Sequence, residues 1–216
     1  MDMKKIEVPL LPRLHKDSPL PLVAEALDAL PRQQIAEEPW PDAQEKPKVS
    51  FAIGYNGDCI FLKYYVQERA VRATYLNTND PVYKDSCVEF FVAFDGEQAY
   101  YNLEFNRLGT CLAGFGHDRH DRRLLPEQAV SQIRRWGTMG EVDAGTKRAA
   151  WQLTLAIPAG VFTAHRFTDF GDTTARANFY KCGDDLPEPH FLAWNRIQAP
   201  QPDFHLPGFF GELRFL

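Results

Sequence analysis

Apolar and polar residues alternate along most of the chain from residue 49 onwards. In the segment CVEFFVAF (87–94), Val88, Phe90 and Val92 occupy alternate positions, and Glu89 falls on the opposite side. A period of two is typical of a β-strand that buries one face. Comparable runs occur at residues 49–55, 59–66, 99–115, 151–158, 175–182, 190–197 and 211–216. The pattern therefore predicts a series of short strands.

Turn signals separate these runs and indicate antiparallel pairing. Asn56-Gly57 lies between two apolar runs, which is a strong hairpin signal, and the DGEQ turn (95–98) joins two more. The pattern shows no alternation of strands with helices. We therefore expect an all-β fold, an antiparallel β-sandwich of the immunoglobulin-like or jelly-roll-like two-sheet kind. Its expected core is formed by Val88, Phe90, Val92, Leu103, Phe105, Trp151, Leu153 and Leu155.

Residues 1–48 differ from the rest of the chain. They hold half of the 16 prolines and one clear helical stretch, residues 22–30, which ends at Pro31. We predict that this Pro-rich segment is an N-terminal arm that wraps a β-sandwich domain formed by residues 49–216. Trp40 is expected to anchor the arm by packing against the domain.

Composition and charge exclude several classes of protein. The net charge of −5 argues against a nucleic-acid partner, because such a surface needs a basic field. No apolar run is long enough to cross a membrane, and the N-terminal residues do not form a signal peptide. We therefore expect no membrane partner, and a cytoplasmic location unless a signal segment has been removed.

The four cysteines are widely spaced along the chain. The sequence has no CxxC pair, so a zinc finger or a thioredoxin-like redox motif has no support. Most of them lie in strand-like runs, where a thiol packs as a small apolar group. We expect reduced thiols at Cys59, Cys87, Cys111 and Cys182.

Polar residues share one face of two neighbouring strands. Asn102, Glu104 and Asn106 alternate with apolar residues, and pairing through the DGEQ turn would place Glu89 on the same face. Carboxylate and amide side chains bind vicinal hydroxyl groups well, because one accepts hydrogen bonds and the other both donates and accepts. A polyhydroxylated ligand is one interpretation, and a solvated outer face is the other.

Two aromatic residues lie near these strands in the sequence. Tyr83 precedes the Glu89 strand, and Trp194 is followed by Asn195. A sugar ring has an apolar face and polar edges, so it binds well against an aromatic ring with hydrogen-bonding groups at the rim. Trp194 is equally compatible with a place in the core.

Other polar clusters are weaker candidates. His117, Asp118, His120 and Asp121 are compatible with a metal site, but a solvated loop with internal ion pairs is the preferred interpretation. His190 and His205 are expected to pack in loops. We expect no cofactor, although Asp184 and Asp185 leave open a structural calcium ion.

Five segments in order resemble the family 9 carbohydrate-binding modules, from about Trp40 to the C-terminus. They are DPVYKDSCVEFFVAF, AYYNLEFNRLGT, RANFYKCGDD, FLAWNRI and FFGELRFL. The resemblance implies a β-sandwich that binds a mono- or oligosaccharide without catalysis, in carbohydrate catabolism. It also implies that two aromatic rings, at Tyr83 and Trp194, enclose a sugar. The polar positions of the family fall on Glu89, Asn102, Lys181 and Asn195.

This sequence departs from the family pattern at the expected site. Tyr83 stands in place of a tryptophan, and Asn102 stands where the family more often has arginine. Lys181 replaces another polar group. The ligand can therefore differ from the glucose or cellobiose end that the family resemblance implies.

Two other functions remain open from the sequence. A glycoside hydrolase would use the paired carboxylates Glu89 and Glu104, although we expect an open sheet face there, which would not keep an acid dry. A binder of another ligand, such as haem, would need an axial residue, for which Met139 and His117 are the candidates.

Overall fold

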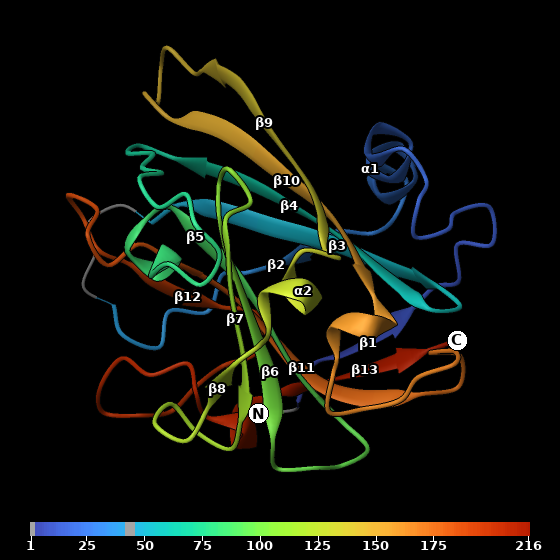
Figure 1. The fold of residues 1–216 in the computed structure, drawn as a ribbon. Helices are drawn as coiled ribbons and strands as arrows, with labels where there is room; N and C mark the ends of the chain where they lie inside the picture. The colour runs from blue at the N-terminus through green and yellow to red at the C-terminus, as the bar shows by residue number, and fades with distance from the viewer. Residues whose placement is uncertain (1–2, 42–45) are drawn as a thin grey trace.

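A computed structural model describes residues 3–41 and 46–216, so residues 1–2 and 42–45 of the expected arm lie outside the described residues. Two β-sheets pack face to face (Figure 1). The eight-stranded sheet has the order β1-β13-β11-β5-β6-β7-β8, with β12 also paired to β11. The five-stranded sheet has the order β2-β3-β4-β10-β9. The expected β-sandwich is confirmed.

The eight-stranded sheet consists of β1 (Lys5–Val8), β5 (Cys87–Phe94), β6 (Tyr100–Asn106), β7 (Cys111–Gly116), β8 (Arg123–Leu124), β11 (Thr174–Cys182), β12 (Phe191–Ala193) and β13 (Gly211–Phe215). The five-stranded sheet consists of β2 (Gln33–Gln34), β3 (Lys48–Asn56), β4 (Cys59–Glu68), β9 (Arg134–Val142) and β10 (Ala149–Pro158). The described pairs are antiparallel, except that β1 runs parallel to β13. Short helices lie between the strands: α1 (Leu20–Asp28), α2 (Glu127–Val130), η1 (Val82–Lys84), η2 (Ala159–Val161) and η3 (Pro207–Phe209). Among the described helices, none is long and apolar enough to cross a membrane.

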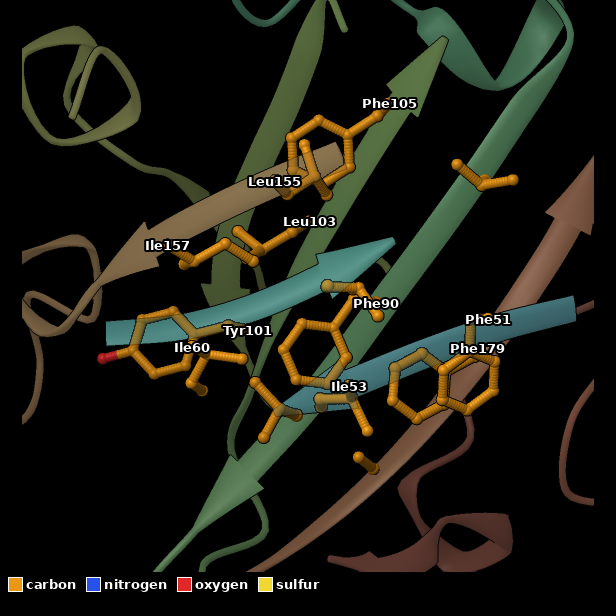
Figure 2. Packing of buried hydrophobic residues seen from close by; sticks show 14 of the residues in the cluster. Phe51, Ile53, Ile60, Phe90, Tyr101, Leu103, Phe105, Leu155, Ile157 and Phe179 are labelled. Carbon is orange, nitrogen blue, oxygen red and sulfur yellow. The ribbon is translucent and has the colours of Figure 1, made fainter. Parts of the chain in front are cut away.

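The core lies between the sheets and is rich in aromatic rings. Phe179 of β11 stacks on Phe51 of β3 and on Phe90 of β5, with ring centroids 3.7 and 5.0 Å apart. Figure 2 shows these rings in the same layer as Leu103 and Leu155, which come from opposite sheets. All eight residues expected in the core are buried there. Period-two alternation therefore identified the inner faces of β5, β6 and β10 correctly.

Both expected hairpins are present. Gly57, between β3 and β4, has a φ of +45°, a conformation that glycine adopts without steric cost. Asp95 and Gly96 occupy the same left-handed region between β5 and β6. This turn fixes the register of the two strands and pairs Glu89 with Glu104.

The N-terminal segment contacts both sheets. β1 extends the eight-stranded sheet beyond β13, whereas α1 packs against β3, β4 and β10 (Figure 1). The helix begins at Leu20 and ends at Asp28, close to the predicted 22–30. Trp40 donates a hydrogen bond from Nε1 to the carbonyl of Ala199 at 2.7 Å. The division of the chain at residue 48 stays a prediction.

A second apolar layer covers the outer face of β5, β6 and β11. It contains Phe91 and Tyr180 from the sheet, together with Phe204 from the loop before η3. Phe204 stacks on Tyr180 with ring centroids 4.1 Å apart. The expectation of an open face around Glu89 was therefore wrong, because loops distant in sequence fold over it.

Candidate functional site

A cavity of about 220 Å³ lies between the outer face of the eight-stranded sheet and the loops that cover it. Its floor is formed by Glu89, Glu104 and Cys182, from three neighbouring strands. The remaining lining residues are Tyr83, Arg119, His120, Arg122, Asp184, Phe191, Pro202, Asp203, Phe204 and His205. The cavity thus combines buried carboxylates, basic groups and aromatic rings.

Glu89 lies at the centre of the floor and is 2% exposed. Its backbone pairs with Glu104 on one side and with Tyr180 on the other. Carboxylate Oε1 accepts a hydrogen bond from Cys182 Sγ at 3.0 Å. Burial, and then the neighbouring charge of Glu104, raise the pKa of Glu89 well above its usual value.

Glu104 is equally buried, but neighbouring side chains donate hydrogen bonds to its carboxylate. Its Oε1 accepts from Asn102 Nδ2 at 2.9 Å and from Arg122 at 3.2 Å. Burial raises the pKa of Glu104, and the charge of Arg122 opposes that shift. Because a guanidinium favours the ionised form, we infer that Glu104 holds the negative charge of the pair. Oε2 of Glu104 is buried without a hydrogen-bond partner among the described residues.

A chain of hydrogen bonds holds the basic side of the cavity. Arg122 lies 3.0 Å from Nε2 of His205, and Nδ1 of His205 lies 2.8 Å from the hydroxyl of Tyr100. Burial, and then the charge of Arg122, lower the pKa of His205 to about 3. A neutral His205 accepts from the guanidinium at Nε2, since arginine only donates, and carries its proton on Nδ1. Arg122 is thereby fixed over Glu104.

Aromatic residues form the wall of the cavity. Tyr83 of η1 and Phe191 of β12 are partly exposed, which leaves part of each ring accessible. Trp40 of the N-terminal segment supports this wall, with its ring centroid 6.4 Å from Phe191 and 6.0 Å from Phe204. The wall therefore depends on residues from three distant parts of the chain.

Trp194 lies in the core between the sheets and not in the cavity. It is 1% exposed, and its ring packs edge-on against Phe51 and Phe179. A Cβ atom on Gly211 would lie 2.4 Å from Trp194 Cζ3, so the indole fills the space beside that glycine. A ring enclosed in this way has no free face for a sugar. The expectation that Trp194 encloses a ligand was wrong.

Lys181 and Asn195 also lie away from the cavity. Lys181 is fully buried on the inner face of β11, where Nζ lies 2.9 Å from Oε2 of Glu68. The Asn195 side chain binds backbone groups of Lys4 and Phe209, and it lines a separate cavity of about 240 Å³. Neither residue joins the expected polar rim, because each faces a different part of the molecule.

Asn102 is fully buried beside Glu104 and does not line the cavity. Its amide donates to Glu104, so it positions that carboxylate. Of the seven expected site residues, the structure brings three together at the cavity. They are Tyr83, Glu89 and Glu104.

The other polar clusters have separate places in the structure. Nδ1 of His117 lies 3.3 Å from Oδ2 of Asp121 in an exposed contact, whereas His120 lines the cavity. Asp184 lines the cavity, and Asp185 lies within 4.0 Å of basic side chains, those of Arg72 and Lys84. For a haem ligand, Met139 lies on β9 of the other sheet and His117 does not line the cavity. The residues proposed for that alternative are therefore not at this site.

Sequence reasoning missed several cavity residues. Arg122 belongs to a basic cluster that was interpreted as a solvated loop, and His205 was expected to pack in a loop. Phe191 and Phe204 carry no local signal, because nothing in their own segments indicates which face of the sheet they cover. The neighbouring histidine and proline residues were the only sign that residues 200–207 form an ordered loop.

A family model and three solved structures place this chain among known proteins. The model of carbohydrate-binding family 9 matches residues 22–215. This chain belongs to carbohydrate-binding family 9. No curated protein shows a significant sequence match to it. The family assignment confirms the resemblance seen in the five sequence segments.

Three of the similar structures come from Bacteroides uniformis and Caldicellulosiruptor kristjanssonii. A protein from Bacteroides uniformis, described as a candidate carbohydrate-binding protein, is 33% identical, with a TM-score of 0.90 and complete coverage of both chains. A family 9 module from Caldicellulosiruptor kristjanssonii was solved with glucose. It is 11% identical to this family 9 protein, with a TM-score of 0.59 over 99% of this chain and 96% of the module.

The structure with cellotriose, from the same organism, is also 11% identical, with a TM-score of 0.57 over 98% of this chain and 93% of the module. At this identity the Caldicellulosiruptor modules share the fold of the family 9 protein.

Proposed function

We propose that this family 9 protein binds a mono- or oligosaccharide in the 220 Å³ cavity, without catalysis. The observation that carries the proposal is the meeting of accessible aromatic rings with buried carboxylates and a fixed guanidinium in one cavity. Tyr83 and Phe191 supply apolar surface for a sugar ring. Glu89 and Arg122 supply an acceptor and donors for its hydroxyl groups.

Phe191 takes the role that the family resemblance gave to Trp194. It comes three residues earlier in the chain and lines the cavity, whereas Trp194 does not. Family 9 modules solved with glucose and cellotriose support a saccharide as the ligand class. Since the cavity of this protein has its own set of polar residues, the saccharide is to be identified on a glycan array.

Alanine substitution of the aromatic wall should weaken sugar binding. Each of Tyr83→Ala and Phe191→Ala is expected to cost about 1–3 kcal/mol of binding, roughly a tenfold to hundredfold loss of affinity. The reason is that stacking on the apolar face of the sugar is lost while the polar contacts remain. Calorimetry with the best saccharide from the array measures the effect.

Trp136→Ala is the matched control for this measurement. Trp136 is 38% exposed on β9 of the other sheet, so its removal should leave the affinity unchanged. Equal affinities of Tyr83→Ala, Phe191→Ala and the parent protein would refute the placement of the sugar in this cavity. Failure of the parent protein to bind any saccharide on the array would refute the proposed function itself.

The carboxylate pair of Glu89 and Glu104 bears on the hydrolase alternative. Each residue is 2% exposed, so the pair lies in a covered cavity and not on an open sheet face. Glycosidases place their two carboxylates on either side of the scissile bond. Here both project from the same face of one sheet as directly paired residues, so both lie on one side of anything in the cavity. This arrangement favours binding over hydrolysis.

We therefore expect no release of reducing ends from an oligosaccharide panel. The measurement compares the parent protein with Glu89→Gln and Glu104→Gln, which remove the acid function while keeping the shape of each side chain. Any background signal should be the same in all three proteins, because it would come from contaminants. Release that is present in the parent and lost in both variants would establish a hydrolase.

A further inference from the structure

Two cysteines and a carboxylate converge at the floor of the cavity. Sγ of Cys87, Sγ of Cys182 and a carboxylate oxygen of Glu89 lie within 4.8 Å of one another. We propose that these three residues bind a thiophilic divalent cation of the Zn²⁺ class. The proposal concerns the metal alone and does not depend on sugar binding.

Strand register fixes the positions of the three ligands. Cys87 of β5 and Cys182 of β11 are directly paired across neighbouring antiparallel strands. Glu89 lies two residues beyond Cys87, so its side chain projects from the same face. Cys87 begins β5 and Cys182 ends β11, and the pairing of these two strands holds the three ligands side by side.

The distances fit a tetrahedral cation. Zn–S bonds of about 2.3 Å and Zn–O bonds of about 2.1 Å place tetrahedral ligand atoms about 3.6–3.8 Å apart. Oε1 of Glu89 lies 3.0 Å from Cys182 Sγ and 4.0 Å from Cys87 Sγ, on either side of that value. Small side-chain rotations would therefore bring the three atoms to ligand positions.

The chemistry of the donors favours a soft or borderline metal. Thiolate ligands select zinc and its heavier relatives over calcium or magnesium, which prefer oxygen. Burial raises the pKa of the Cys87 thiol to about 12 and that of Cys182 well above its usual value. A bound cation would reverse this effect by displacing the thiol protons, as in other zinc sites.

Residues around the three ligands complete the arrangement. Cys182 and Glu89 line the cavity, which provides an entry path for the ion. Glu104, the strand partner of Glu89, has a buried Oε2 without a hydrogen-bond partner among the described residues. Glu104 lies outside the group of three ligands, so we assign this oxygen as an acceptor for a water molecule bound to the metal.

The remaining cysteines are natural controls. Cys59 and Cys111 are also buried free thiols, but neither belongs to a cluster of potential metal ligands among the described residues. Cys59 makes a weak contact with the adjacent carbonyl of Ile60 at 3.7 Å. Substitution of these two cysteines should therefore leave metal binding unchanged.

The test is a titration of the reduced, metal-free protein with Cd²⁺ and with Zn²⁺ in the absence of sugar. We expect one Cd²⁺ per chain, with the ultraviolet charge-transfer absorption of cadmium–thiolate bonds, and displacement of bound Zn²⁺ by Cd²⁺, which is the softer ion. Cys87→Ser and Cys182→Ser should each lower the affinity by at least roughly a hundredfold, since loss of a direct ligand exceeds the effect of outer-shell changes. Cys59→Ser and Cys111→Ser should bind as the parent does.

Glu89→Gln keeps both thiols and provides a second variant if the serine variants fold poorly. It should retain the charge-transfer absorption and bind Cd²⁺ more weakly. Absence of the absorption from the folded, reduced parent protein would overturn the proposal. Equal losses in the Cys59 and Cys87 variants, or a Cys87–Cys182 disulfide that persists in reductant, would overturn it as well. Because no sugar is present, these outcomes are independent of the glycan array.

Discussion

Trp194→Ala is expected to lower the free energy of unfolding by about 3–5 kcal/mol, and to leave the sugar affinity of the folded protein unchanged. Such a loss is a large share of the roughly 5–15 kcal/mol that stabilises a typical domain. The indole is 1% exposed and packs against Phe51 and Phe179, which belong to opposite sheets. Its removal would leave a cavity at the point where the two sheets meet.

The neighbouring backbone limits how far this cavity can collapse. Gly211 of β13 lies directly against the indole, and β13 is hydrogen-bonded on one side to β1 and on the other to β11. Strands held on both sides move little, so the lost packing is only partly recovered. We therefore expect the cost to lie toward the upper part of the range.

Urea unfolding of the parent and of Trp194→Ala measures the stability, and calorimetry with the same samples measures the affinity. Trp136→Ala is the matched control, because it removes an indole that is 38% exposed, and its cost should be well below that of Trp194→Ala. A variant that kept its stability but lost binding tenfold or more would place Trp194 at the ligand. That result would contradict the buried position described above.

The sequence predicted the parts of this fold that depend on local pattern. Alternation identified the inner faces of β5, β6 and β10, and the turn at residues 95–98 fixed the register of β5 and β6. A short turn determines which residues are opposite, so Glu89 and Glu104 were expected on one face and are directly paired. Register is local information, and it was available from the sequence.

The sequence did not predict in the same way which face of a strand carries the site. Lys181 was expected at the polar rim, but it lies on the inner face of β11, whereas the next residue, Cys182, reaches the cavity. Alternation predicts that Lys181 and Cys182 project from opposite faces of the strand. Long-range packing decides which of these faces carries the site. The cover over Glu89 depends likewise on Phe191, Phe204 and His205, which are about 100 residues away in the chain.

Lys181 belongs to a buried polar network between the sheets. Nζ donates to the carbonyl of Cys182 and contacts Nε2 of His190, both at 2.8 Å. Nζ of Lys181 also lies 2.9 Å from Oε2 of Glu68. This contact is an ion pair and does not have the angles of a hydrogen bond. Oε1 of Glu68 accepts from Nε1 of Trp151 at 2.6 Å. The network thus joins β11 of one sheet to β4 and β10 of the other.

His190 is neutral in this network. Burial, and then the charge of Lys181, lower the pKa of His190 to about 3. The ammonium group of Lys181 is therefore the positive charge that balances Glu68, because a neutral imidazole supplies none. Removal of Lys181 would take away the lysine that is ion-paired, among the described residues, with a carboxylate that is 3% exposed.

Lys181→Met is accordingly expected to cost about 3–5 kcal/mol of stability, because breaking a buried ion pair leaves an uncompensated charge. Adding Glu68→Gln should recover part of the loss, since the amide oxygen still accepts from Trp151 and no charge remains buried.

Lys63→Met is the matched control. Lys63 is also buried, but its partner Asp28 has a side chain 44% exposed, so water can replace the lost contact and about 1 kcal/mol or less is expected. Urea unfolding at neutral pH measures all four proteins, and equal costs for the two lysine variants would show that the Glu68 charge needs no partner.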